Sequence, residues 1–336
     1  MKTIFKTITF IVTSALLYHC DNDDPNPTIH IPDNNFLNAL IERGVDTNGD
    51  RIISSNEAAM IRSLDVNFEN IADMTGIEAF VNLDTLDCSF NQIPSLDVSN
   101  NIALKWFSCH ENRLTNLDIS HNTDLKSLYC SSNQLTSLDV SNNSALIWLY
   151  CDYNYLSSLD VSYNIALIRL VCGNNLLTGL DISNNHALEV LFCQRNQFSS
   201  LDISNNKKLT SFECWQNQLT SIDVSKNISL ESLRSSDNHL TALDISNNHA
   251  LEVLHCQSNK LTRLDVSNNN DLLWLLCGEN QLTSLDISTN TSLEYVYLND
   301  MTSLYEVCVW EMPFPPAGVE VDTTNSPNVY FTTECN

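Results

Sequence analysis

Oxygen-bearing side chains alternate along one short segment near the N-terminus, a pattern that suits a hard metal ion. Within DTNGDRIISSNE, residues 46–57, such side chains stand at Asp46, Asn48, Asp50, Ser54 and Glu57. Ca²⁺ takes roughly six to eight oxygen ligands, which closely spaced donors on a tight loop can supply. The segment therefore predicts one Ca²⁺ site, and a metal-free acidic turn is the alternative.

The same segment resembles the calcium-binding loop of the EF-hand family. The resemblance implies that Ile52 contributes its backbone carbonyl, that Ser54 reaches the ion directly or through water, and that Glu57 closes the site. Apolar residues recur at helical spacing before the loop, and NEAAMIRSL after it can start a second helix. We therefore expect a helix–loop–helix over residues 35–60. The departure from the family is Arg51, which stands where the EF-hand has Gly for a sharp turn.

The N-terminus has the pattern of an export signal. Lys2 and Lys6 precede an apolar run too short to span a bilayer, which is typical of a signal peptide over residues 1–19. The run ends at Cys20 and resembles a bacterial lipoprotein signal, which implies lipidation of Cys20; an ordinary secretory signal is the alternative. The acidic residues that follow resemble the surface-export signals of Bacteroidetes lipoproteins, and their composition predicts a disordered tether over residues 20–34. We thus expect a lipoprotein at the outer membrane or cell surface of a bacterium.

Charge and missing motifs exclude two classes of function. The chain has 336 residues, of which 41 are acidic and 16 basic, and its net charge is −25. Nucleic acid binding requires a basic surface, so we expect no nucleic acid partner. The Gly-x-Ser-x-Gly, His-Glu-x-x-His, Walker and dinucleotide-binding motifs are absent from the sequence. We therefore expect no enzymatic activity.

A 21-residue repeat occupies most of the chain, and each unit has two similar halves, as in LKSLYCSSN and LTSLDVSNN. A unit this short has no room for a long helix, so each half should form a short strand. No single unit can bury its apolar face alone, so the coils must stack. The pattern resembles the short bacterial leucine-rich repeat over residues 61–310, and the segment before it resembles the start of internalin-like surface proteins. The predicted fold class is a mainly β solenoid of parallel coils with a helix–loop–helix cap.

Three columns of the repeat carry reactive side chains that have structural explanations. Two columns of Asn should turn the chain at its corners and bond the backbone of adjacent coils. Nine Cys share an apolar position that Ser235 and Leu298 also occupy, so we expect buried free thiols and no metal site. An outward column of Asp should accept hydrogen bonds from nearby backbone N–H groups or from the Ser two residues on. Weak cation binding along that column is the alternative.

The last segment, residues 311–336, breaks the repeat and is expected to form a C-terminal cap. Cys308 stands at an outward position of its strand, and Cys335 lies close to the C-terminus. Because an exported protein meets an oxidising environment, we expect a disulfide between Cys308 and Cys335 that closes the last coil.

Large aromatic residues gather at outward positions in the Cys half of the repeat, on the face that is concave in leucine-rich repeat proteins. An exposed aromatic stripe usually marks a contact surface, and stacking that only stiffens the sheet is the alternative. We expect noncatalytic binding of a protein ligand on this face; glycan binding and a purely structural spacer are the alternatives. The predicted ligand-binding residues are Trp106, Tyr129, Trp148, Tyr150, Phe192, Trp215, Trp274, Tyr295 and Tyr297.

Overall fold

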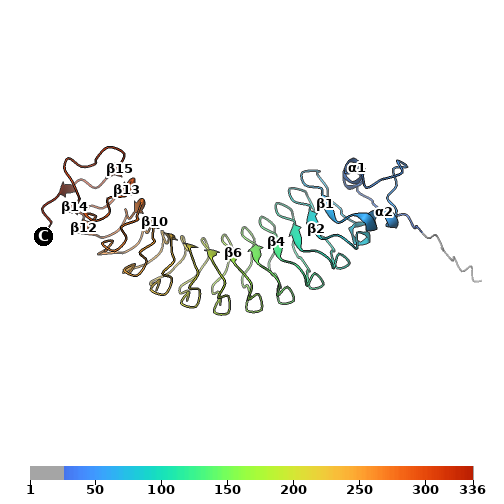
Figure 1. The fold of residues 1–336 in the computed structure, drawn as a ribbon, viewed down its shortest axis with the longest axis horizontal. Coiled ribbons are helices and arrows are strands. Elements are labelled where there is room, and N and C mark those ends of the chain that lie inside the picture. Colours follow the sequence, from blue (N-terminus) through green and yellow to red (C-terminus); the bar gives the residue numbers. More distant parts are fainter. Residues whose placement is uncertain (1–25, 336) are drawn as a thin grey trace, which may run out of the picture.

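The computed structural model describes residues 26–335, which form one curved solenoid (Figure 1). The coils follow one another along an arc, and the helices stand at its N-terminal end (Figure 1). The predicted mainly β solenoid of parallel coils with an N-terminal helical cap is confirmed. The predicted signal peptide and the predicted lipidation site at Cys20 lie outside the described residues. No helix within the described part of the chain is long and apolar enough to cross a bilayer.

The secondary structure consists of short elements. The helices are α1 (Asn34–Glu42), α2 (Ser55–Met60) and the 3₁₀ helix η1 (Ile77–Ala79). A long sheet contains β1 (Ser63–Asp65), β2 (Thr85–Asp87), β3 (Trp106–Ser108), β4 (Ser127–Tyr129), β5 (Trp148–Tyr150), β6 (Arg169–Val171), β7 (Val190–Phe192), β8 (Ser211–Glu213), β9 (Ser232–Arg234), β10 (Val253–His255), β11 (Trp274–Leu276), β13 (Tyr295–Tyr297) and β15 (Glu320–Asp322). A second sheet contains β12 (Ser284–Asp286), β14 (Glu306–Cys308) and β16 (Tyr330–Thr332).

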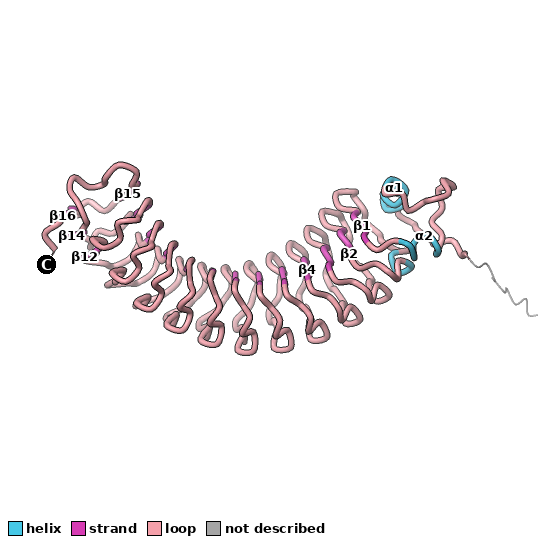
Figure 2. Tube along the Cα trace, in the orientation of Figure 1, coloured by secondary structure: helices cyan, strands magenta, loops and turns pink. Residues whose placement is uncertain are grey.

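The long sheet has 13 parallel strands and follows the inner side of the arc (Figure 2). From β2 to β13 each strand pairs with the equivalent residues of the next repeat, so that Leu128 lies opposite Leu149. The middle residue of each strand points into the core; Leu128 and Leu149 are both 0% exposed. The two flanking residues therefore face out of the concave side, where a ligand has access to them.

The first column of Asn holds the corner that follows each strand of the long sheet. In Asn112, Nδ2 donates to the carbonyl oxygens of Cys88 (2.9 Å) and Cys109 (3.1 Å), and Oδ1 accepts from the backbone N–H of Ile93 (3.0 Å). One amide thus pairs backbone groups of two adjacent coils, which burial would otherwise leave without partners. The members are Asn91, Asn112, Asn133, Asn154, Asn175, Asn196, Asn217, Asn238, Asn259 and Asn280.

The second column of Asn holds the opposite corner but uses only half of each amide. In Asn122, Nδ2 donates to the carbonyl oxygens of Val98 (3.1 Å) and Asn101 (2.9 Å), whereas Oδ1 is buried without a hydrogen-bond partner. Both expected roles of Asn, turning the chain and bonding adjacent coils, are therefore present. The members are Asn101, Asn122, Asn143, Asn164, Asn185, Asn206, Asn227, Asn248, Asn269 and Asn290.

The Asp half of the repeat differs from its prediction. We expected a strand in each half, but among the described residues the second sheet is confined to β12, β14 and β16 at the C-terminal end. The curvature explains the difference, because coils that are hydrogen-bonded on the inner side of an arc must diverge on its outer side. Each Asp instead closes its own turn; Asp118 Oδ1 accepts from the backbone N–H of Ser120 at 2.9 Å.

Residues 26–34 belong to the N-terminal cap, so the predicted disordered tether is wrong for this part of residues 20–34. The Ile29 N–H donates to the Ile53 carbonyl at 2.8 Å, and Ile29 and Ile31 pack against the core. Asp33 caps α1 through its Oδ1, and its Oδ2 accepts from the backbone N–H of Ala72 at 2.7 Å. The packing of two apolar side chains and the capping of α1 by one carboxylate hold this segment in place, although its polar composition predicts disorder.

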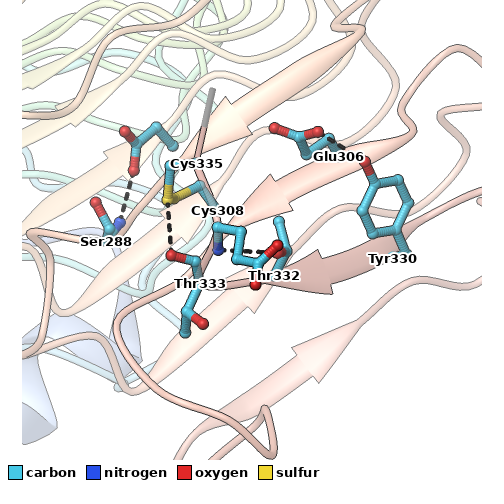
Figure 3. Close-up of a disulfide and its surroundings, with 9 residues drawn as sticks. Ser288, Glu306, Cys308, Tyr330, Thr332, Thr333 and Cys335 are labelled. Carbon is cyan, nitrogen blue, oxygen red and sulfur yellow. Dashed lines mark hydrogen bonds between the residues drawn. A yellow bond between two sulfur atoms is a disulfide. The ribbon is translucent and has the colours of Figure 1, made fainter.

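The C-terminal segment, predicted as a cap over residues 311–336, adds a further coil to the solenoid. Strand β15 pairs with β13 and strand β16 pairs with β14, both in parallel register. Cys308 and Cys335 form the disulfide that closes this coil (Figure 3). Cys308 is only 3% exposed, because the chain that carries Cys335 covers its outward position.

The column of nine Cys is fully buried, and all nine thiols are free. Burial raises the pKa of Cys172 and of Cys277 to about 12, so these thiols are neutral at physiological pH. Ser235 occupies the same column with 0% exposure, and its Oγ makes a single long hydrogen bond of 3.5 Å to the His255 carbonyl. The thiols therefore act as small apolar side chains, as the sequence predicts.

Opposite substitutions in this column should change stability in opposite directions. We expect Cys151→Ser to lower the free energy of unfolding by about 1–3 kcal/mol, because it buries a hydroxyl among apolar neighbours. Ser235→Cys should raise the same quantity by up to about 1 kcal/mol. Urea unfolding followed by circular dichroism under reducing conditions measures both. A stabilising Cys151→Ser would contradict the apolar role of the thiols.

Candidate functional site

The concave face offers the surface on which the sequence-predicted binding residues meet. Along each strand of the long sheet the residues before and after the buried one point outward, and the residue after the Cys position forms a third outward column. All nine predicted aromatic residues belong to these columns. The structure divides them into an early patch (Trp106, Tyr129, Trp148 and Tyr150), a late patch (Trp274, Tyr295 and Tyr297) and two residues between the patches (Phe192 and Trp215).

The early patch combines a stacked row with one free ring. The rings of Trp106 and Tyr129 have centroids 5.4 Å apart, and those of Tyr129 and Tyr150 are stacked at 4.8 Å. Arg169 Nη1 donates to the Tyr150 hydroxyl at 3.1 Å. Trp148 is 43% exposed and lies outside this row of ring contacts. Stacking thus explains three of the rings, as the structural alternative requires, and Trp148 remains as the ring outside the stacked row.

The late patch is tied more tightly to its neighbours. Trp274 and Tyr295 have ring centroids 4.5 Å apart, and the Tyr297 hydroxyl donates to Glu320 Oε1 at 3.1 Å. The remaining two predicted residues lie between the patches: Phe192 is half-buried, and the Trp215 indole N–H donates to Glu213 Oε2 at 3.1 Å. The predicted stripe is therefore two separate aromatic surfaces.

A third aromatic group was not expected from the sequence. Phe68 and Phe90 are stacked with centroids 4.1 Å apart, and His110 packs edge-on against Phe90 at 4.7 Å. Phe68 is 65% exposed. Both Phe residues have left-handed backbones, with φ of 57° and 53°, as do the equivalent residues before each corner Asn. The residue type at this position varies from coil to coil, so the sequence analysis did not identify these positions as a column. Their constant place before the corner Asn is the signal that could have identified them.

The predicted calcium loop has the backbone shape of a tight ligand loop. Asp46 accepts hydrogen bonds from the backbone N–H groups of Gly49 (2.7 Å) and Arg51 (2.9 Å). Asn48 Oδ1 and Asp50 Oδ1 each accept from the N–H two residues on, both at 2.8 Å. Arg51 has a φ of 64°, so the sharp turn that Gly makes in the EF-hand exists here in spite of the side chain.

Glu57 is held from two sides at the end of this loop. Its Oε1 accepts from the N–H and hydroxyl of Thr47, both at 2.8 Å, and its Oε2 accepts from the N–H (2.9 Å) and hydroxyl (2.7 Å) of Ser54. These hydrogen bonds, those from Ser54 first, lower the pKa of Glu57 to about 2 although the side chain is only 5% exposed. Ser54 and Glu57 also form the capping box of α2.

The loop fits a Ca²⁺ ion in its donor chemistry. The side chains of Asp46, Asn48, Asp50, Ser54 and Glu57 and the Ile52 carbonyl supply oxygen only, the element that Ca²⁺ prefers. The carboxylates of Asp46, Asp50 and Glu57 do not converge within 4.8 Å in this structure. Within residues 26–335 the group of metal-ligating side chains that does converge is Asp286, Cys308 and Cys335, whose two sulfurs are joined in the disulfide.

The chain is similar to known proteins in sequence and in structure. No protein-family model matches the chain. A segment of 70 residues is 39% identical to Internalin J of Listeria monocytogenes, and the match spans 21% of this chain but only 8% of that protein. The solved functional domain of Listeria InlJ, described as including a cysteine ladder, is 31% identical with a TM-score of 0.51; the match covers 77% of this chain and 70% of that domain.

Two further solved structures share the fold at lower identity. The Listeria internalin InlF is 18% identical with a TM-score of 0.68, and the match covers 91% of this chain and 96% of that one. A chain of the LRIM1/APL1C complex is 23% identical with a TM-score of 0.61, and the match covers 76% and 50% of the two chains. At these identities the likeness concerns the fold alone.

Glu57 should make the stability of the cap depend on pH. Its folded pKa is depressed, so its contribution is complete above the ordinary pKa of about 4.5 and is lost as the pH falls toward 2. We expect Glu57→Gln to lower the free energy of unfolding by about 1–3 kcal/mol at pH 7. The difference from wild type should shrink between pH 4.5 and pH 2 in thermal unfolding scans. Glu42→Gln, an exposed acid in α1, is the control; a pH-independent effect of Glu57→Gln would contradict the assignment.

Proposed function

The chain belongs to the internalin-like leucine-rich repeat proteins, and from this premise we propose that it is a noncatalytic binding protein whose concave face holds a protein ligand. The observation that carries the proposal is the exposed Trp148 in the early patch. A large aromatic side chain in water does not stabilise the fold, but it contributes strongly when a partner covers it. The solved complex of LRIM1 with APL1C shows that proteins of this fold associate with other proteins.

The early patch is the proposed centre of the interface. Three of its rings are fixed by stacking and by the Arg169 hydrogen bond, so little side-chain entropy is lost when a partner binds. Trp148 stands beside this rigid row with the freedom to enter a pocket of the partner. Such a combination of a rigid platform and one exposed anchor is typical of an interface hot spot.

We also propose that the protein is exported and anchored by lipid at Cys20 on the bacterial cell surface. Support comes from the apolar N-terminal run before Cys20 and from the disulfide between Cys308 and Cys335, which is stable in an oxidising environment. An outward-facing position would also give the concave face access to partners outside the cell.

One Ca²⁺ ion in the loop of residues 46–57 completes the proposal. The support is the all-oxygen donor set and the tight turn through Arg51. The loop lies next to the first coils, so an ion there would stiffen the end of the solenoid nearest the early patch.

Replacement of Trp148 should separate binding from folding. We expect Trp148→Ala to reduce recovery of the protein ligand at least tenfold in affinity capture from the natural surroundings, quantified by mass spectrometry. The melting temperature should stay within about 1 °C of wild type, because the ring is exposed and unstacked. Tyr163→Ala, which removes a 60% exposed ring from the Asp half of the repeat, is the matched control. Equal recovery with all three proteins would favour a structural spacer.

Calcium binding is tested by calorimetry on the metal-stripped protein. Titration with Ca²⁺ should give one binding event in the wild type and none in Asp46→Ala, because Asp46 offers a carboxylate at the first position of the loop. Asp118→Ala, in the outward Asp column, is the control and should bind like wild type. Heat that survives in Asp46→Ala but falls in Asp118→Ala would place the ion on the Asp column instead.

A further inference from the structure

Basic side chains border the early patch along one edge of the concave face. The residue directly before each strand of the long sheet belongs to a further column, which we call the edge column. Its backbone continues the hydrogen bonding of the sheet, since the Lys126 N–H donates to the Lys105 carbonyl at 2.8 Å. Both lysines are exposed, next to β3 and β4. Arg169 lies opposite Trp148 in the paired strands β5 and β6, so three cations border the rings of the early patch.

These three cations have no acidic partner in the described part of the chain. Residues 26–335 contain two ion pairs, and neither involves Lys105, Lys126 or Arg169. The two lysines are neighbours in the edge column, with backbones roughly 5 Å apart, where like charges repel even in water. Arg169 donates one hydrogen bond to the Tyr150 hydroxyl and keeps further donors for a partner. Stability of the fold therefore does not explain the position of these cations.

The early patch lies on a positive stretch of an otherwise negative chain. In the edge column and the three outward columns, the coils of β3 to β6 carry these three bases and one acid, Asp152, which accepts a hydrogen bond from the Ser131 hydroxyl. Glu111, further out on the same coils, leaves the sign unchanged. At the same positions the coils of β2, β7 and β8 carry acids and no base: Asp84, Asp87, Glu189 and Glu213. With a net charge of −25 for the whole chain, this excess of bases is local.

The late patch has the opposite charge. Its edge column carries Glu231, Glu252 and Glu294 beside β9, β10 and β13. The base among the outward residues of these coils is Arg234, which pairs with Glu213 at 3.6 Å. The two patches thus resemble each other in their aromatic rings and differ in sign, so one partner chemistry does not suit both.

The centre of the early patch is apolar. Ile147 and Ile168 follow the two lysines in the edge column, and both are half-buried beside β5 and β6. Trp148 stands next to Ile147 with its ring exposed, and the cations lie on either side of this centre. A linear acidic polysaccharide would need a longer basic row than two lysines. The surface fits a protein segment in which an apolar side chain is flanked by carboxylates.

We propose that the ligand of the early patch is an acidic protein segment. An apolar side chain of that segment packs on Trp148, and Asp or Glu side chains beside it face Lys105, Lys126 and Arg169. The inference rests on the proposed function, in which the early patch binds protein, and it adds the charge class of the partner. Complementary charge speeds association and excludes partners of the wrong sign. Because the other coils of the concave face are negative, they repel an acidic segment and leave the early patch as its docking place.

The test selects ligands from random dodecapeptides displayed on phage, with the full-length protein as bait. Peptides that bind wild type but not Trp148→Ala report on the early patch. We expect these peptides to be more acidic than the starting library by about two charges each, because three cations lack a partner. A neutral or basic average would overturn the inference and leave the proposed function standing. If no peptide depends on Trp148, both the inference and the proposed function fail.

The most enriched of these peptides is then synthesised, and its affinity is measured by fluorescence anisotropy. The double variant Lys105→Glu/Lys126→Glu should bind it about tenfold more weakly, since two attractions become repulsions. Its melting temperature should stay within about 1 °C of wild type, because both side chains are exposed and unpaired. Raising NaCl from about 50 to about 300 mM should weaken binding to wild type more than binding to the double variant.

Glu231→Lys/Glu252→Lys is the matched control, with two reversed charges in the same edge column beside the late patch. It should bind the peptide like wild type. Equal affinity of wild type and Lys105→Glu/Lys126→Glu would overturn the inference. Heparin that binds wild type more tightly than the peptide, and loses this binding in Lys105→Glu/Lys126→Glu, would overturn it in favour of an acidic polysaccharide.

Discussion

The hydrogen bonds of the buried Asn side chains are the constraint on which the solenoid depends. A 21-residue coil must turn sharply, and each corner brings backbone N–H and C=O groups into an apolar interior. Asn112 pairs such groups from two adjacent coils with one amide, and at the opposite corner Asn122 donates to two carbonyl groups of the previous coil. Each of these amides belongs to one coil and forms hydrogen bonds with the previous coil. A coil therefore cannot be lengthened or shifted without loss of these hydrogen bonds. The constant repeat length follows from this reciprocity.

The curvature of the rod goes together with a difference between the two sides of each coil. The inner side is held by the long parallel sheet, whereas the outer side is held by Asp residues that close their own turns. The coils lie close together on the inner side of the arc and spread apart on its outer side (Figure 2). The same asymmetry gathers the outward residues of thirteen strands onto one concave surface. The early and late aromatic patches therefore lie on the same concave surface, although 191 residues separate Trp106 from Tyr297.

Features that recur in every coil could be predicted from the sequence. Features that depend on the shape of the whole rod or on contacts outside the repeat could not. The Leu, Asn and Cys columns predict the stacked coils, the bonded corners and the buried thiols, because identical environments recur in every coil. The lack of a strand in the Asp half depends on curvature, which is a property of the whole rod. The order of residues 26–34 depends on the contact of Ile29 with Ile53, and the extra coil after residue 310 depends on pairing across sequences that no longer repeat.

The disulfide between Cys308 and Cys335 makes the two ends of the solenoid unequal, because only the C-terminal end is closed by a covalent bond. A stack of coils comes apart from its ends, because a terminal coil has one neighbour and an interior coil has two. At the C-terminus the last coil is closed by a disulfide between two residues that are 27 positions apart in the sequence. The coil cannot separate fully from the solenoid while this bond is intact. At the N-terminus the closing elements are two short helices, which are held by apolar packing of Phe36 and Leu40 in the core and by the hydrogen bonds of Glu57, with no covalent link. Opening that starts at the helical end breaks no covalent bond, and it reaches the coil that carries Trp106 before the coil that carries Trp274.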